Sequence, residues 1–200
     1  MHVARIDEGL WRWTSAHPEW KPGDDWDRDV GCVYWEAGDA VVLVDPLVPT
    51  DEGERDRFLG ALDRDVGRLG LPVVVLLTCA WHRRGADELA ERYRARVIEP
   101  PADEPLPGGA VAVRAPSAEE VVYWLPAARS VVTGDALLGR DGGVAVCPEA
   151  WLASRVGVAR LVSDLAPLLA LPVERVLTSH GPPVLEGGRE ALARALGAAP

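Results

Sequence analysis

The stretch from Val73 to Tyr93, VVVLLTCAWHRRGADELAERY, constrains the fold more than any other part of the chain. It opens with an unbroken apolar run, Val73 to Leu77, which is typical of a buried strand. It closes with apolar residues at the spacing of one helix face, namely Ala86, Leu89, Ala90 and Tyr93. The segment from Thr78 to Gly85 is then a tight strand-to-helix turn. Turns at the carboxyl ends of buried strands are where α/β proteins usually place binding and catalytic groups.

Composition restricts the class of protein. With 200 residues and 48% hydrophobic content, the chain is expected to form one globular domain over residues 1–200 with a sizeable core. The net charge of −10 argues against nucleic acid or an anionic membrane surface as a partner. The start of the sequence lacks a signal-peptide pattern, and the three scattered cysteines do not suggest a disulfide framework, so we expect a reduced, cytoplasmic protein.

The pattern along the chain alternates strands and helices. Strands are expected at 5–14, 31–37, 40–45, 73–77, 97–98, 110–113, 120–125, 130–133 and 175–178, and helices at 50–69, 86–93, 151–169 and 188–196. Gly38-Asp39 predicts a tight hairpin turn. The segment Ser15 to Asp29 is a polar loop that carries Trp20 and Trp26. These two aromatics either fold over a cleft or cover a sheet edge.

Four segments resemble the metallo-β-lactamase superfamily. The turn described above, LLT followed by GADELAERY, is similar to the family's T-H-x-H-x-D-H loop, which binds two metal ions. VLVDP, VVTGD and LTSHGPP resemble three further family motifs. The resemblance implies an α/β fold, the four-layer αβ/βα sandwich of the metallo-β-lactamase type. It also implies that Asp45, in VLVDP, buttresses the metal loop, and we expect its carboxylate to hold backbone amides there.

The metal ligands of the family are mostly replaced. When the loop motif is aligned from Thr78, the ligand positions are occupied by Cys79, Trp81, Arg83 and Arg84. The segment 114–120 lacks the family's histidine before the second sheet. Asp135 matches the metal-bridging aspartate and His180 matches the last ligand. We therefore expect no cofactor; the alternative is zinc held by Cys79, Asp135 and His180.

The sequence leaves several functions open. The first is a pseudoenzyme, non-catalytic or a binder of an anionic small molecule, in which Arg84, or as second candidate Arg83, neutralises Asp135. Its candidate binding residues are Trp81, His82, Arg83 and Arg84, although His82 falls on a non-ligand position of the metal motif and is expected to face solvent. The second is a hydrolase of esters, thioesters or lactones with an atypical single metal, or with water activated by His180 and Asp135. The third is covalent chemistry by Cys79 with His180 or His82 as base, against which stands the usual role of a buried cysteine as a small hydrophobe.

Overall fold

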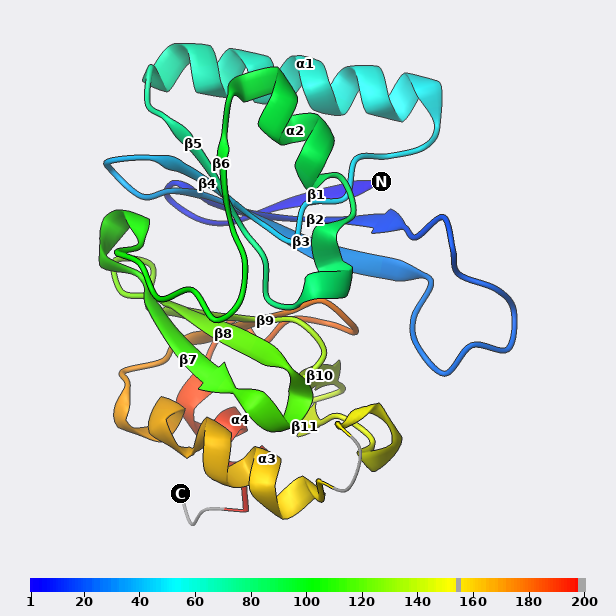
Figure 1. Ribbon diagram of the computed structural model, residues 1–200, viewed down its shortest axis with the longest axis vertical. Helices are drawn as coiled ribbons and strands as arrows, with labels where there is room; N and C mark the ends of the chain where they lie inside the picture. The colour runs from blue at the N-terminus through cyan, green and yellow to red at the C-terminus, as the bar shows by residue number, and fades with distance from the viewer. Residues whose placement is uncertain (154–155, 198–200) are drawn as a thin grey trace.

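Two β-sheets lie face to face with helices on their outer sides (Figure 1). This computed structural model describes residues 1–153 and 156–197. The first sheet has the order β1-β2-β3-β4-β5-β6, with bounds His2–Asp7, Leu10–Ala16, Asp29–Glu36, Val41–Val44, Val73–Leu76 and Arg96–Ile98. The second has the order β12-β9-β8-β7, with bounds Arg175–Thr178, Ser130–Thr133, Glu120–Leu125 and Val111–Ala115. A separate hairpin consists of β10 (Leu137–Arg140) and β11 (Gly143–Val146).

Three apolar cores separate the four layers, and alternation along single strands explains them. In β4, Val41 and Leu43 pack toward the helices, whereas Val42 and Val44 pack toward the other sheet. In β8, Tyr123 joins the core between the sheets, and the neighbouring strand residues on the opposite face contact the outer helices. Because both faces of these strands are covered, their sequences are almost entirely apolar, and Glu120 at the start of β8 is the charged exception. The predicted αβ/βα sandwich is confirmed.

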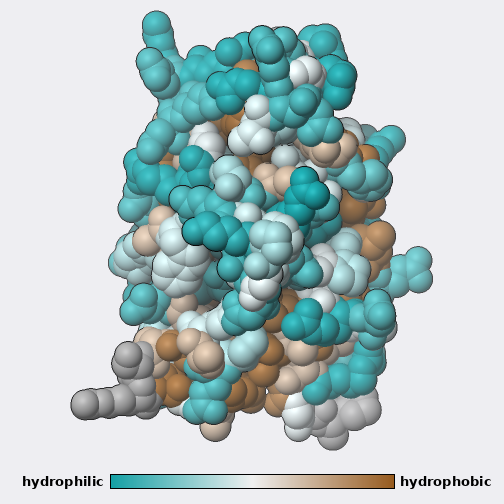
Figure 2. Space-filling view, turned by 90° about the vertical axis from the view of Figure 1, so that its right-hand side faces the viewer, coloured by the Kyte–Doolittle hydropathy of each residue, from teal (hydrophilic) through white to brown (hydrophobic). Residues whose placement is uncertain are grey.

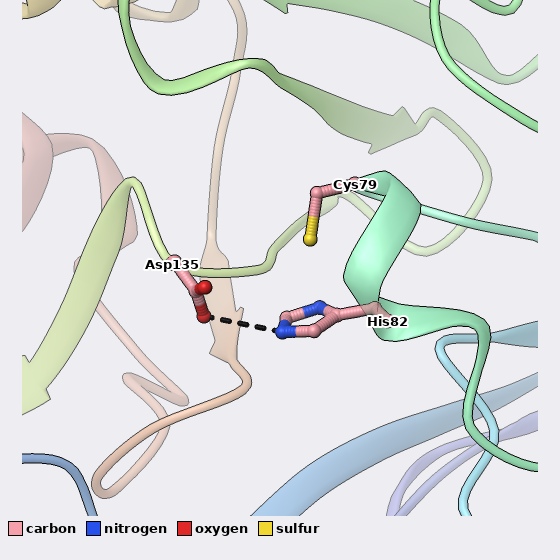
Figure 3. A group of neighbouring side chains, drawn as sticks. All are labelled: Cys79, His82 and Asp135. Atoms are coloured by element: carbon pink, nitrogen blue, oxygen red, sulfur yellow. Dashed lines mark ion pairs between the residues drawn. The ribbon is translucent and has the colours of Figure 1, made fainter. Parts of the chain in front are cut away.

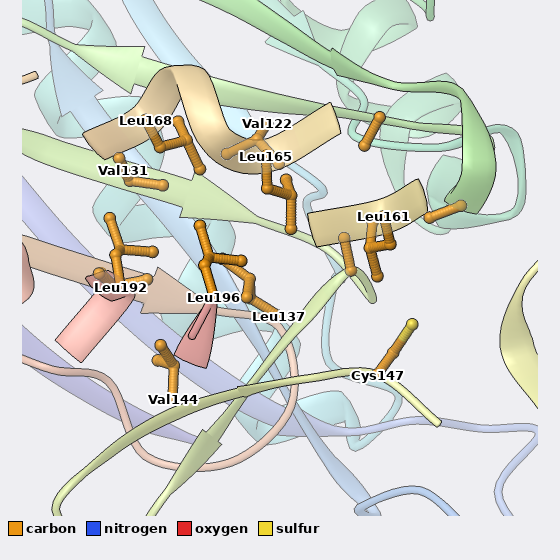
Figure 4. Close-up of a cluster of buried hydrophobic side chains, with 14 of the residues drawn as sticks. Val122, Val131, Leu137, Val144, Cys147, Leu161, Leu165, Leu168, Leu192 and Leu196 are labelled. Atoms are coloured by element: carbon orange, nitrogen blue, oxygen red, sulfur yellow. The ribbon is translucent and has the colours of Figure 1, made fainter. Parts of the chain in front are cut away.

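Two helices cover the outer face of each sheet. α1 (Glu52–Leu69) and α2 (Ala86–Tyr93) lie on the first sheet; α3 (Val158–Leu165) and α4 (Gly188–Ala195) lie on the second, against the cluster drawn in Figure 4. α1 begins and ends as its sequence predicts: the Asp51 carboxylate accepts the Glu54 N–H, and Gly70 adopts a left-handed conformation. In Figure 2 the surface over α1 is mainly hydrophilic, and hydrophobic atoms gather in the lower half of that face.

Two predicted elements differ from those observed. The single strand expected at 5–14 is wrong: it is two strands, β1 and β2, which turn at Gly9 with φ of 67°. The long helix expected at 151–169 is also wrong. The chain forms a 3-10 turn at Glu149–Trp151, then α3, and then a second 3-10 segment at Ala166–Ala170, where Pro167 removes a helical hydrogen-bond donor. Residues 154–155 of that prediction lie outside the described residues.

The topology brings four loops to one edge of the sandwich. β4 and β5 are parallel neighbours, and so are β9 and β12, so the loops that follow each pair leave from the same end. A backbone hydrogen bond from Gly31 N–H to Ser179 O, 2.7 Å long, ties the two sheets together there. None of the helices within residues 1–153 and 156–197 combines the length and apolar character that a membrane crossing requires.

Candidate metal centre

The loop after β5 is held by the aspartate that follows β4. Asp45 is 2% exposed, and its Oδ1 accepts the backbone N–H of Thr78 at 2.8 Å while Oδ2 accepts the Thr78 hydroxyl at 2.5 Å. The expected role of Asp45 in holding loop amides is therefore confirmed. Next to Thr78, Cys79 is extended and fully buried, and a short 3-10 turn, η1 (Ala80–Arg83), follows.

His82 lies at the centre of the site. The residue is 3% exposed, so the expectation that it faces solvent is wrong. The tight 3-10 turn directs it inward, where Nδ1 is 2.9 Å from Asp45 Oδ2 and Nε2 is 3.2 Å from Asp135 Oδ1. Burial would lower the pKa of His82, but the two carboxylates outweigh burial and raise that pKa well above its ordinary value. Without a metal, His82 lies between two carboxylates and holds its proton more strongly than a free imidazole does.

Asp135 is placed by a buried glutamate that the sequence analysis missed. Glu120 is 3% exposed, and its Oε1 accepts the Thr133 hydroxyl and the Gly134 N–H at 2.9 and 2.7 Å. Its Oε2 accepts the N–H groups of Asp135 and Ala136 at 2.8 and 2.7 Å. Burial and the nearby Asp135 raise the pKa of Glu120 to about 7, against the opposing effect of these backbone donors. A charged residue at the start of the apolar strand EVVYWL was the available signal.

His180 reaches the same carboxylate from the second sheet. Its Nε2 is 3.2 Å from Asp135 Oδ1, and its side chain is buried. Burial opposes ionisation of Asp135, but the two imidazoles prevail and hold its pKa far below the usual range. The His180 loop is fixed by Arg12, whose Nη2 donates to Thr178 O at 3.0 Å and to Gly181 O at 3.1 Å. Gly31 makes room for this guanidinium, since a Cβ there would lie 2.4 Å from Nη2.

Three donor atoms converge as metal ligands do. One ligand atom each from Cys79, His82 and Asp135 lies within 4.8 Å of the other two (Figure 3). Thiolate, imidazole and carboxylate are the donors that zinc prefers. Asp135 Oδ1 is buried and lacks a well-directed hydrogen bond from any described residue, so a cation would satisfy it. Burial raises the pKa of the Cys79 thiol to about 11, and a bound cation would displace that proton. These residues fit a metal ion.

The group of mutually close donors differs by one residue from the set that the sequence offers as the alternative to no metal. That alternative is Cys79, Asp135 and His180; in the structure the close group contains His82, and His180 Nε2 is 3.2 Å from Asp135 Oδ1. The expectation that no metal is bound is not confirmed. Buried Cys79, with its raised pKa, does not have the character of a nucleophilic thiolate.

The two arginines of the loop behave differently from each other. Arg84 does not pair with Asp135: its Nη2 donates to Ser179 Oγ at 2.9 Å and its Nη1 to Asp45 O at 3.3 Å. The expected Arg84–Asp135 pair is therefore wrong. Arg83 has a side chain 46% exposed and pairs with Asp87 and Glu99, outside the cavity.

A cavity of about 320 Å³ opens onto the site. His82, Asp135 and His180 line it, and its walls include Trp26, Trp81 and Trp151. Trp26 and Trp151 meet the His180 ring edge to face, with centroids 5.7 and 5.9 Å away. The Trp81 indole donates to Asp135 Oδ2 at 2.8 Å.

Both interpretations of the loop tryptophans apply to Trp26. It lines the cavity, and it also packs against the apolar core on the outer face of the first sheet. Trp20 supports it by donating its indole N–H to Trp26 O at 2.9 Å. Figure 2 looks at the side of the molecule that carries this loop, which joins β2 to β3.

Comparisons with solved structures identify the fold. The chain resembles a metallo-β-lactamase from Pontibacter korlensis (17% identity, 98% of this chain and 97% of that chain, TM-score 0.58). It also resembles a metallo-β-lactamase from Erythrobacter litoralis in a mono-zinc form (16%, 98% and 94%, TM-score 0.59). A third similar structure is a metallo-β-lactamase family protein from Thermus thermophilus (18%, 96% and 80%, TM-score 0.53). No family model and no curated protein sequence matches the chain.

Proposed function

We propose that this chain, which has the metallo-β-lactamase fold, is a hydrolase that holds one divalent metal ion, zinc by its donor set, through Cys79, His82 and Asp135. The observation that carries the proposal is the approach of these three donors to within 4.8 Å of one another. The second support is Asp45 behind His82, because metal-binding histidines usually donate their other ring N–H to a carboxylate. The substrate class is a small ester, thioester or lactone.

The chain's own residues prepare this chemistry. By accepting a hydrogen bond from Nδ1–H, Asp45 favours the His82 tautomer whose Nε2 carries the lone pair, and Nε2 is the ring nitrogen next to Asp135. His180 Nε2 and the Trp81 indole hold Asp135 from two sides. The tryptophans around the cavity give it an apolar wall against which a substrate can pack. A metal ion bound there would lower the pKa of a water ligand and polarise the scissile carbonyl.

A second candidate is a non-catalytic binder of an anionic small molecule. The observation in its favour is that Trp81, Arg83 and Arg84 stand where the resembled motif has metal ligands. Arg84 lines the cavity, but so do the acidic residues Glu19, Asp25 and Asp135. This excess of carboxylates favours a cation at the site, and we therefore rank the metal-dependent hydrolase first.

Metal content tests the proposal. Protein purified without a metal-binding tag is dialysed against zinc, iron and manganese salts, and bound metal is measured by mass spectrometry. We expect near-stoichiometric metal in the wild type and in Cys147→Ser, which changes another buried free thiol. His82→Ala and Asp135→Ala should lose it. Cys79→Ser should bind metal more weakly and, when loaded with Co²⁺ at high concentration, should lack the thiolate-to-cobalt charge-transfer band that the wild type shows. Metal-free wild-type protein with chelator-insensitive stability would retire the hydrolase and leave the anion binder.

A further inference from the structure

A second chamber adjoins the candidate metal centre. It measures about 400 Å³, against about 320 Å³ for the first. Four residues line both chambers: His17, Glu19, Trp81 and Arg84. Because these four residues belong to both linings, the two chambers are adjacent, with Arg84 at the boundary between them.

Arg84 brings an uncompensated positive charge to this boundary. Its guanidinium donates to two uncharged oxygens, the hydroxyl of Ser179 and the backbone carbonyl of Asp45. Within residues 1–153 and 156–197, no carboxylate lies within ion-pair distance of it. Its Nε is buried and lacks a hydrogen-bond partner there. By contrast, the neighbouring Arg83 is paired with two carboxylates. The backbone of Arg84 has a φ of 35°, a strained value for a residue with a side chain, and this conformation sets the direction in which the side chain leaves the backbone.

The second chamber has a buried apolar part, and the two charged residues that line this chamber alone, Arg55 and Glu88, form an ion pair. Leu47, Val48 and Pro49 line it and are buried. Arg55 and Glu88, which also line it, neutralise each other through an ion pair of 2.5 Å. The part of a ligand that occupies this chamber is therefore expected to be apolar and uncharged.

We propose that the substrate is an acyl compound with a single carboxylate at Arg84 and an apolar arm in the second chamber, a proposal that rests on the function proposed above. The carboxylate is expected to take the spare guanidinium donors. One negative charge is the limit, because Glu19, Asp25 and Asp135 also line the cleft and would repel a dianion. The scissile carbonyl then lies on the metal-centre side of Arg84.

Binding of non-reactive probes to metal-stripped protein tests the substrate class. The probes are 4-phenylbutyrate, its neutral isostere 4-phenylbutyramide, and acetate, with affinities measured by isothermal titration calorimetry. We expect the wild type to bind phenylbutyrate at least about tenfold more tightly than the amide, because a charge-assisted pair is lost with the amide. Acetate should bind at least about tenfold more weakly than phenylbutyrate, because it lacks the apolar arm. Equal affinity for acid and amide, or for acetate and phenylbutyrate, would overturn the proposal without any variant.

Variants locate the anion. Arg84→Met should abolish the preference for the acid over the amide, and Arg84→Lys, which keeps the charge, should retain part of it. Arg83→Met is the matched control and should retain all of it. If the preference survives in Arg84→Met, or appears only after zinc is added, the Arg84 assignment fails while the metal-dependent hydrolase stands. If the preference follows Arg84 but no metal is taken up, the hydrolase fails and the carboxylate site stands.

Discussion

Replacing Asp45 by asparagine should weaken the support of His82 and of the loop at Thr78, without removing any of the three metal donors. One Asp45 oxygen serves the Thr78 N–H, and the other serves both the Thr78 hydroxyl and His82 Nδ1. An asparagine must put its NH₂ group on one side. Facing His82, it forces the ring proton onto Nε2, which then points at Asp135 in place of a lone pair. If the NH₂ group faces Thr78 instead, it meets the Thr78 backbone N–H, which is also a donor, and the hydrogen bond from this N–H to residue 45 is lost.

The magnitude follows from the bonds lost. In metal-free protein, Asp45→Asn removes a charge-assisted hydrogen bond, a loss of about 1.5–3 kcal/mol, and leaves buried His82 with one carboxylate partner in place of two. We therefore expect the free energy of unfolding to fall by about 2–4 kcal/mol. Metal affinity should fall by about 10–100-fold, the usual effect of removing the carboxylate partner of a metal-bound histidine.

Denaturant unfolding of metal-free protein measures the first effect, and competition with a chelator of known affinity measures the second. The matched control is Asp87→Asn, which removes a carboxylate from the exposed pair with Arg83. It should change stability far less and leave metal affinity unaltered, because surface pairs are screened by water. An Asp45→Asn protein as stable as the wild type, with unchanged metal affinity, would refute the role given to the Asp45–His82 contact.

Three further predictions test other parts of the structure. Gly134→Ala should lower stability and metal uptake, because its Cβ would lie 2.3 Å from Thr78 Oγ1. Gly60→Ala within α1 should instead raise the free energy of unfolding by about 0.5–1 kcal/mol. Denaturant unfolding measures both changes in stability. For Asp164, burial opposes ionisation, but hydrogen bonds outweigh it and lower the pKa, so Asp164→Asn should be less stable at neutral pH by about 1–2 kcal/mol. That difference should vanish as the pH falls through the lowered pKa of the folded state; a pH-independent difference would contradict it. In metal-free protein, Cys79 should react with a thiol reagent only after unfolding, and rapid reaction of the native state would contradict its burial.

The sequence predicts the frame well because the frame depends on local patterns. Strand β5, the α1 caps and the Gly38-Asp39 turn each rest on a few neighbouring residues, and these signals agree with one another. The β1–β2 hairpin is missed because its turn, Glu8-Gly9, interrupts a segment that mixes aromatic and polar residues evenly.

The site is predicted less well because its contacts join residues far apart in sequence. The motif register assigns ligand positions to Trp81, Arg83 and Arg84, but the 3-10 geometry of η1 turns His82 inward between them. Glu120 and Arg12 act on the site through backbone groups of other loops, which no local pattern reveals. Asp135 is the exception, because its motif places it directly after a well-predicted strand.

The division of the site between the two halves of the sandwich has a thermodynamic consequence. Asp45, Cys79 and His82 belong to the first half of the sandwich, and Asp135, Glu120 and His180 to the second, so neither half contains a complete site. A metal ion that binds only the docked arrangement would stabilise docking of the halves by mass action, about 2.7 kcal/mol at a concentration 100 times its dissociation constant. Bound metal would then stabilise the contact between the two sheets. Its loss would let the two sheets separate before either sheet unfolds.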